Sequence, residues 1–202
     1  MRQKPVQRAR AVNVAQVARA ATELLDRGGL RALTVRAVAH QLDVAPASLY
    51  SRLTSADDLF DLALDDALGQ DTELQGSIEQ ASLHQLMLAY YRHLVRHPWA
   101  CQVIAMRAPR GPNYLQLSER ICVLLSDMGA SDPLGDAYAL SNLVIGSAAT
   151  TPMAGHERAA PVDSEIAPVY ASLHSTHQVN TETIVSTGLH ELLRRHPRAS
   201  ED

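Results

Sequence analysis

The sequence has few of the residues that metal-bound, disulfide-rich or sheet-rich proteins need. It holds two cysteines, Cys101 and Cys122, and neither has the spacing of a metal or redox motif. This usage fits the reducing cytoplasm, and we expect no cofactor and no metal. Aromatic residues make up only 4% of the chain, and Ala, Leu and Val supply most of the 46% hydrophobic content. Such a composition favours helix over sheet.

Long apolar runs are also scarce. No such run follows the basic N-terminus, MRQKPVQRARAV, so we expect no signal peptide. Residues 137–155 carry no charge, but Ser141, Asn142, Thr150 and Pro152 interrupt their apolar character. We therefore expect a helix buried on several sides rather than a membrane span.

The charge is distributed unevenly along the chain. Residues 1–56 carry nine basic and three acidic side chains, a balance of +6, whereas the remainder has a balance of −10. A basic N-terminal quarter indicates contact with a polyanion. Four of the nine basic groups lie in residues 1–10, so a basic tail that contributes little is the alternative interpretation.

Residues 12–54 have the pattern of three short helices. Apolar residues recur at helical spacing up to Gly28-Gly29, and Thr34 is placed to cap a second helix. Asp43 occupies the left-handed turn that ends this helix, and Pro46 starts the third. A fourth helix is predicted from Ser55, with Asp58 as its capping-box partner.

The third segment buries very little of itself. Its pattern leaves only Leu49 and Leu53 for the core and exposes the residues between and before them. In a helix-turn-helix the second helix enters the major groove, so DNA would cover this exposed face. Tyr50 and Arg52 can contact phosphates or guanine, and Arg36 can reach in beside them.

The stretch ALTVRAVAHQLDVAPASLYSRLTSADDLFDLAL, residues 32–64, resembles the DNA-binding region of TetR-family transcriptional regulators. RHPWACQVIAMRAPRGPN, DAYALSNLVIGSA and TGLHELL are similar to the C-terminal domain of the branch that contains the tetracycline repressor. The resemblance implies an all-helical homodimer in which a small ligand alters the separation of two recognition helices. It carries the family's DNA contacts onto Thr34, Arg36, Ala47, Ser48, Tyr50 and Arg52.

Two departures from the family pattern are informative. A lysine that commonly grips phosphate at the start of the fourth helix is Ala56 here. The histidine that coordinates the drug-bound magnesium in the tetracycline repressor falls on Ile104, and two further drug contacts fall on Leu86 and Tyr90. We therefore expect a more apolar pocket and a different ligand.

These observations predict an all-α chain of two parts. Residues 1–54 are expected to form the helix-turn-helix DNA-binding domain, with residues 1–10 as a basic tail, and residues 55–202 a larger effector-binding and dimerisation domain reached through a linking helix. The predicted ligand contacts are Leu86, Met87, Tyr90, Trp99, Ile104, Tyr138 and Asn142. Helices over Ala137–Ala149 and Thr183–Arg195 are expected to form a four-helix dimer bundle, with Gly146 and Gly188 allowing close approach.

The predicted function is a repressor that a small, largely apolar ligand releases from a palindromic operator. The alternative is a small helical enzyme or carrier with an incidental helix-turn-helix-like corner, which would need a catalytic constellation that the sequence lacks. The pairs His93/His97 and His174/His177 have metal-ligand spacing but no third ligand, so we expect packed or solvated histidines. The apolar stripe that includes Met87 is a core stripe unless the domain is hollow.

Overall fold

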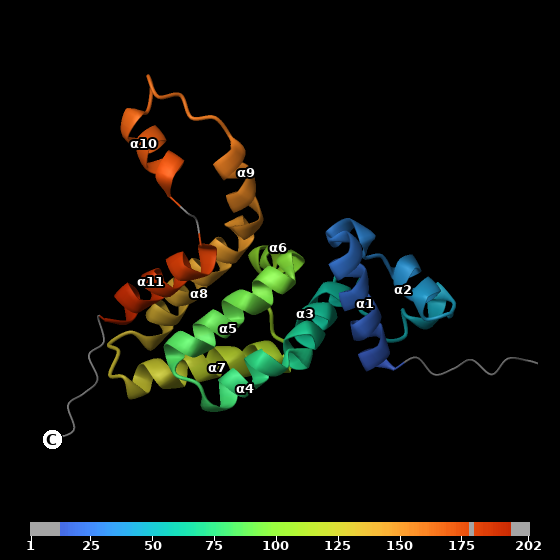
Figure 1. Cartoon of the computed structure of the whole chain (residues 1–202). Helices are drawn as coiled ribbons and strands as arrows, with labels where there is room; N and C mark the ends of the chain where they lie inside the picture. Colours follow the sequence, from blue (N-terminus) through green and yellow to red (C-terminus); the bar gives the residue numbers. More distant parts are fainter. Residues whose placement is uncertain (1–12, 178–179, 195–202) are drawn as a thin grey trace, which may run out of the picture. The chain divides into compact units, whose positions relative to one another are not determined.

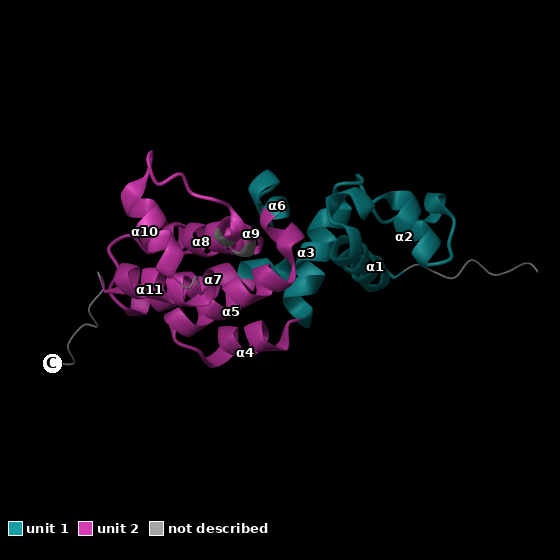
Figure 2. Ribbon diagram, turned by 45° about the horizontal axis from the view of Figure 1, so that its top comes forward, with its two compact units in different colours: residues 1–70, 102–115 teal, residues 71–101, 116–202 magenta. Residues whose placement is uncertain are grey.

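The computed structural model describes residues 13–177 and 180–194, and every regular element in these two ranges is helical. The predicted all-α fold is therefore confirmed. The chain divides into two compact units, residues 1–70 with 102–115 and residues 71–101 with 116–202 (Figure 2). The boundary expected after residue 54 lies inside the first unit and stays a prediction, and the basic tail lies outside the described residues.

The first unit consists of short helices around α1 (Figure 1). Its elements are α1 (Val14–Gly28), η1 (Leu30–Ala32), α2 (Val35–Gln41), η2 (Pro46–Ser48) and α3 (Asp58–Gln70). The Asn13 side chain caps α1, and the Thr34 hydroxyl caps α2 by accepting from the Ala37 amide at 3.0 Å. Gly29, with φ of 63°, ends α1 in a conformation that favours glycine.

Helices α1 and α3 form the centre of this unit. Both helices bury small side chains, including Ala20 and Ala21 on α1 and Ala63 on α3. Thr22 adds a polar link, because its hydroxyl lies 3.1 Å from the Ala63 carbonyl oxygen and 3.2 Å from the Asp66 carboxylate. The contact thus combines apolar burial with a hydrogen bond that fixes the helix register.

The second unit is built around α5 (Leu83–Arg96), which packs against α4 (Thr72–Gln80), α8 (Pro133–Thr150) and α11 (Thr181–Leu193). A capping box of Ser82 and Gln85 begins α5, and Asp132 caps α8. Helices α6 (Pro98–Met106) and α7 (Pro112–Asp127) each contribute residues to both units. Among the described residues no helix is long and apolar enough to cross a membrane.

Some predicted boundaries were wrong. The composition of PMAGHERAAPVD, residues 152–163, predicts a loop, but the chain forms η3 (Thr151–Met153) and α9 (Ala154–Ala159) before α10 (Pro168–Thr176). In Figure 1, α9 and α10 extend from the end of α8, and α10 buries none of its residues. Helix α3 begins at Asp58 rather than Ser55, because the preceding turn uses i→i−3 hydrogen bonds. The end of α11 was predicted at Arg195, outside the described residues.

Leu49 provides a test of how the short third segment is held in place. Its side chain is 0% exposed, whereas its neighbour Tyr50 is 60% exposed. We expect Leu49→Ala to lower the free energy of unfolding by about 2–5 kcal/mol, because the substitution removes buried methyl groups and leaves a cavity. Urea unfolding followed by circular dichroism measures this. Tyr50→Ala is the adjacent control and should change stability by no more than about 0.5 kcal/mol; equal effects of the two substitutions would contradict the assignment.

Candidate functional site

The segment of residues 46–53, here called the reader segment, forms a succession of tight turns. The Leu49 amide donates to the Pro46 carbonyl at 3.1 Å, and the Arg52 and Leu53 amides both donate to the Leu49 carbonyl, at 2.8 and 3.1 Å. The expected third helix is therefore a 3₁₀ turn followed by irregular turns rather than a regular α-helix. Leu49 and Leu53 are 0% and 6% exposed, which confirms that these two side chains anchor the segment.

The residues predicted to contact DNA lie on the surface of the first unit. Ala47, Tyr50 and Arg52 are exposed on the reader segment, and Ser48 is half-buried; Arg36 is exposed on α2. Thr34 is exposed as well, and its hydroxyl already serves as the cap of α2. The assignment of all six residues to a DNA contact stays a prediction.

A tight turn joins α2 to the reader segment. Asp43 adopts a φ of 52°, in the left-handed region that Asp tolerates better than most residues, as the sequence predicted. The Val44 amide then donates back to the Ala39 carbonyl at 3.0 Å, which closes the turn. This closure sets the direction in which the chain leaves α2.

Positive charge on the reader surface is not neutralised within the described chain. Two other arginines of this unit have partners: Arg19 pairs with Asp66 at 3.4 Å, and Arg27 donates to the Gln41 side chain at 2.5 Å. In the described ranges neither Arg36 nor Arg52 makes a hydrogen bond or an ion pair. Two exposed, unpaired guanidinium groups and the exposed Tyr50 are suited to phosphate oxygens and base edges.

The exit of the reader segment is held by the Asp58 carboxylate. It accepts from the Thr54 amide at 2.6 Å and from the Ser55 amide and hydroxyl at 3.1 and 2.9 Å. The predicted capping box is thus present in one direction, from Asp58 back to Ser55. These hydrogen bonds, first those of Ser55, lower the pKa of Asp58 below its ordinary value.

Further carboxylates of α3 bind the corner between α6 and α7. The Arg107 guanidinium donates to both oxygens of Asp61, at 2.9 and 2.8 Å, and lies 3.1 Å from Asp57. Asp65 accepts from the Asn113 amide at 2.8 Å and from its side chain at 2.9 Å. Gly111 permits this approach, since a Cβ there would lie 2.2 Å from an Asp65 oxygen. The corner is therefore fixed to α3 by charge and hydrogen bonds.

The predicted ligand contacts fall into different environments. Leu86, Met87, Tyr90 and Trp99 are almost completely buried in the second unit. Tyr138 is 64% exposed and Asn142 is also exposed, because they lie on the side of α8 opposite its buried stripe. Ile104 is half-buried and belongs to the first unit. The four buried side chains can therefore contact a ligand inside the second unit. Tyr138 and Asn142, which are exposed on α8, are instead accessible to another protein chain.

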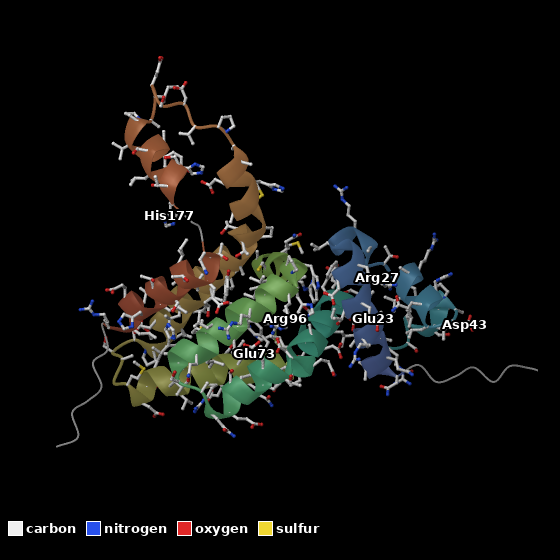
Figure 3. The ribbon with its side chains drawn as sticks, viewed as in Figure 1. Glu23, Arg27, Asp43, Glu73, Arg96 and His177 are labelled. Atoms are coloured by element: carbon white, nitrogen blue, oxygen red, sulfur yellow. The ribbon has the colours of Figure 1, made fainter. Side chains whose placement is uncertain are left out.

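A charged cluster that the sequence reasoning missed lies where α4 meets α5. His93 Nδ1 is 2.8 Å from Asp71, and Arg96 donates to Asp71 at 2.5 Å and to Glu73 at 3.1 Å. Arg96 and Glu73 are labelled in Figure 3. Arg92 continues the chain of contacts to Glu73 and Glu182. Burial opposes ionisation of Asp71, but the hydrogen bonds from His93, Arg96 and the Leu74 amide hold its pKa far below its ordinary value.

The predicted metal spacing of the histidines leads to no metal cluster. His93 is engaged by Asp71, and its ring lies 4.9 Å from that of His97 between centroids. In residues 13–177 and 180–194 no group of three or more metal-ligating side chains comes together.

The outer faces of α8 and α11 are apolar and uneven. Leu134, Tyr138 and Ile184 are each more than half exposed. A Cβ at Gly146 would meet nothing within 4 Å, whereas one at Gly188 would lie 3.1 Å from the Leu143 side chain. A groove of about 650 Å³ runs between the two helices, lined by Leu143, Gly188, Glu191, Leu192 and Arg194. Such a surface is suited to a helical partner.

Together, the helix-turn-helix unit with its exposed arginines and the helical second unit have the architecture of a DNA-binding transcriptional regulator. The chain belongs to the TetR family. Residues 17–63 match the model of bacterial regulatory proteins of the tetR family, and residues 76–179 match that of the tetracycline repressor-like C-terminal domain. Membership of this family favours the regulator over the enzyme, the two functional classes considered from the sequence.

Two relatives are similar in sequence. An HTH-type transcriptional regulator of Saccharopolyspora erythraea is 35% identical over 159 residues, which cover 75% of this chain and 66% of that protein. The HTH-type transcriptional repressor DrrR1 of Streptomyces coeruleorubidus is 33% identical over 124 residues, 58% of this chain and 45% of that protein. The chain thus spans less than two thirds of the length of each.

Solved structures share the fold. A TetR regulator of Streptomyces coelicolor has a TM-score of 0.72 at 20% identity, over 91% of this chain and 97% of that one. The Streptomyces coelicolor TetR family protein ActR, in complex with (S)-DNPA, has a TM-score of 0.71 at 23% identity, over 91% of this chain and 96% of that one. At these identities the likeness concerns the fold alone.

The Asp58 cap leads to a pH-dependent prediction. Because the pKa of Asp58 is lower in the folded than in the unfolded chain, its carboxylate stabilises the fold above the unfolded value of about 3.9. That contribution is lost as the pH falls through the folded pKa. We expect Asp58→Asn to be less stable than wild type at pH 7, with a smaller difference at pH 3, in urea unfolding. Asp127→Asn is the control, because Asp127 is exposed. If the difference in free energy of unfolding between wild type and Asp58→Asn does not change with pH, the role assigned to Asp58 is wrong.

Proposed function

We propose that this chain is a repressor that binds a palindromic operator as a homodimer and leaves it when a small, largely apolar molecule binds the second unit. The reader segment carries this proposal. Its leucines are buried, while Tyr50, Arg52 and the neighbouring Arg36 present hydrogen-bond donors and unpaired positive charge to the exterior. The relative DrrR1, which is named as a repressor, supports repression over activation.

Dimerisation would use the outer faces of α8 and α11. Leu134, Tyr138 and Ile184 expose apolar side chains to water. A second copy that covers them removes this apolar surface from water, which favours association. Gly146 leaves space for close approach of a second helix. Two copies of each helix would then form the four-helix bundle expected from the sequence, with a two-fold axis that gives the operator its palindromic symmetry.

The effector would bind among the buried apolar residues of the second unit. Leu86, Met87, Tyr90 and Trp99 are the side chains we retain as its wall, and we assign the exposed Tyr138 and Asn142 to the dimer surface instead. Structures of ActR in complex with (S)-DNPA and with actinorhodin support ligand binding within this fold. Burial of an apolar effector would contribute about 25 cal/mol per Å² of apolar surface removed from water.

The signal would reach the DNA-binding helices through the α6–α7 corner. Arg107 and Asn113 fix this corner to Asp61 and Asp65 of α3, and α3 packs directly on α1. A displacement of α6 or α7 by a ligand would therefore move α3 with it. Conversion of an operator-bound population from 1:99 to 99:1 requires about 5.5 kcal/mol of difference in the affinity of the ligand for the two forms.

The DNA-binding proposal is tested with an operator selected in vitro from random duplexes. We expect a palindrome whose half-sites are one helical turn apart, about 34–36 Å, or a multiple of it. Arg36→Ala should weaken binding by roughly 1–3 kcal/mol if the guanidinium reads a base, and Tyr50→Phe should weaken it as well, because the phosphate contact of the hydroxyl is lost. Fluorescence anisotropy at several salt concentrations measures both effects.

Arg110→Ala serves as the charge-matched control, because it removes one exposed guanidinium from the segment between α6 and α7, outside the reader segment and outside α8 and α11. It should leave operator affinity unchanged. Full operator affinity in both Arg36→Ala and Tyr50→Phe, or failure of the selection to enrich any palindrome, would refute the assignment of the reader segment.

The dimer is tested by adding bulk at an open glycine. Gly146→Leu should shift the protein toward monomer in analytical ultracentrifugation, because the added side chain would prevent close approach of a second helix. Gly188 is a poorer choice, since a side chain there also clashes with Leu143 within the same chain. Gly76→Leu is the matched control, because Gly76 is likewise helical and open. A monomeric wild type at micromolar concentration would rule out the bundle.

A further inference from the structure

His93 is buried in the second unit with only one of its two ring nitrogens engaged. Its side chain is 0% exposed, and Nδ1 lies 2.8 Å from the Asp71 carboxylate. Nε2 is also buried, and no atom of the described residues forms a hydrogen bond with it. A buried polar atom without a partner is costly, so a protein that retains one needs a reason.

The neighbours of His93 determine what Nε2 can do. Asp71 is ionised, since hydrogen bonds from His93, Arg96 and Leu74 hold its pKa down despite burial, so it can only accept. Nδ1 must therefore carry the proton and donate it to Asp71. Burial lowers the pKa of His93, which keeps the ring neutral. Nε2 is consequently a hydrogen-bond acceptor, because the hydrogen bond from Nδ1 to Asp71 fixes the tautomer of the imidazole ring.

The position of His93 on α5 places this acceptor among the apolar side chains assigned to the effector. Leu86 and Tyr90 precede His93 by seven and three residues, so the three lie along one face of the helix. All three side chains are at most 2% exposed, and α5 packs against both α8 and α11. The same face therefore offers apolar area and one directional polar group, which is the usual make-up of a small-molecule site.

We infer that His93 Nε2 accepts a hydrogen bond from a hydroxyl group of the effector, which makes the effector a hydroxylated, largely apolar molecule. Asp71 is the positioning residue, because it holds the ring in the accepting tautomer. The inference rests on the proposed function, namely that an effector binds in the second unit. A buried acceptor discriminates strongly, since an effector without a donor leaves Nε2 unpaired in an apolar site.

The test uses matched probes that differ in one substituent: 2-naphthol, naphthalene and 2-methoxynaphthalene, with the corresponding hydroxy, parent and methoxy anthraquinones. Isothermal titration calorimetry with the full chain should show that wild type prefers a hydroxyl probe over its parent by roughly five- to tenfold, as expected for one hydrogen bond. The methoxy compound, which has the oxygen but no donor, should bind no better than the parent.

The variants separate recognition from packing. His93→Phe should bind the parent compound at least as well as wild type and lose the preference for hydroxyl. Asp71→Asn, which can still cap α4, should reduce the same preference because an amide does not fix the tautomer. His84→Phe is the matched control on α5, since His84 Nε2 already lies 3.3 Å from the Ser186 carbonyl oxygen. It should keep the wild-type preference.

A spectroscopic measurement covers the case in which His93→Phe does not fold. In ¹⁵N-labelled wild type, the Nε2 resonance of His93 should shift on addition of a hydroxyl probe and remain in place with the parent. Equal affinities of wild type for hydroxyl and parent compounds, or an unshifted Nε2 resonance with a bound hydroxyl probe, would overturn the inference. So would the absence of binding by every hydroxyl probe. None of these results affects the operator experiment, which tests the DNA-binding function separately.

Discussion

The packing of α1 against α3 is the contact on which the DNA-binding surface depends. The reader segment has only Leu49 and Leu53 in the core, so it cannot fold alone and must be positioned by the helices around it. Both helices bury alanines, and the Thr22 hydroxyl of α1 lies within hydrogen-bond distance of the Ala63 carbonyl oxygen of α3. A DNA-binding surface needs polar side chains outside, so the apolar burial that stabilises it has to come from its neighbours.

Much of this unit could be predicted from the sequence because its signals are local. Apolar spacing located α1 and α2, Thr34 marked a cap, and Asp43 marked the left-handed turn. The geometry of the reader segment was not predictable in this way. A run of eight residues with Pro46 at its start fits a 3₁₀ turn as well as an α-helix, and hydrogen bonds that neither pattern nor propensity specifies determine the outcome. The same holds for α9, where a loop-like composition forms a short helix.

The interior of the second unit was less predictable, since periodicity shows that a helix has an apolar face but not what covers it. Tyr138 illustrates this limit: it lies on a helix with few charges, yet its side chain is exposed. His93 illustrates the opposite case. Its partner Asp71 is 22 residues away and caps another helix, so the pair is recognisable only after α4 and α5 have packed. Long-range polar pairs of this kind require the fold to be known first.

The acidic excess of the chain beyond residue 56 acquires a physical explanation from these contacts. Along α3 and the start of α4, the carboxylates of Asp58, Asp61, Asp65, Asp71 and Glu73 accept hydrogen bonds from arginines, a histidine or backbone amides. These acids are therefore used to hold helices together rather than left as free negative charge. Arg36 and Arg52, in contrast, have no such acceptor within the described chain. The acidic composition of the chain beyond residue 56 is thus compatible with a basic DNA-binding surface. The attraction to a phosphate depends mainly on the unpaired charges within about a Debye length of it, and less on the net charge of the whole chain.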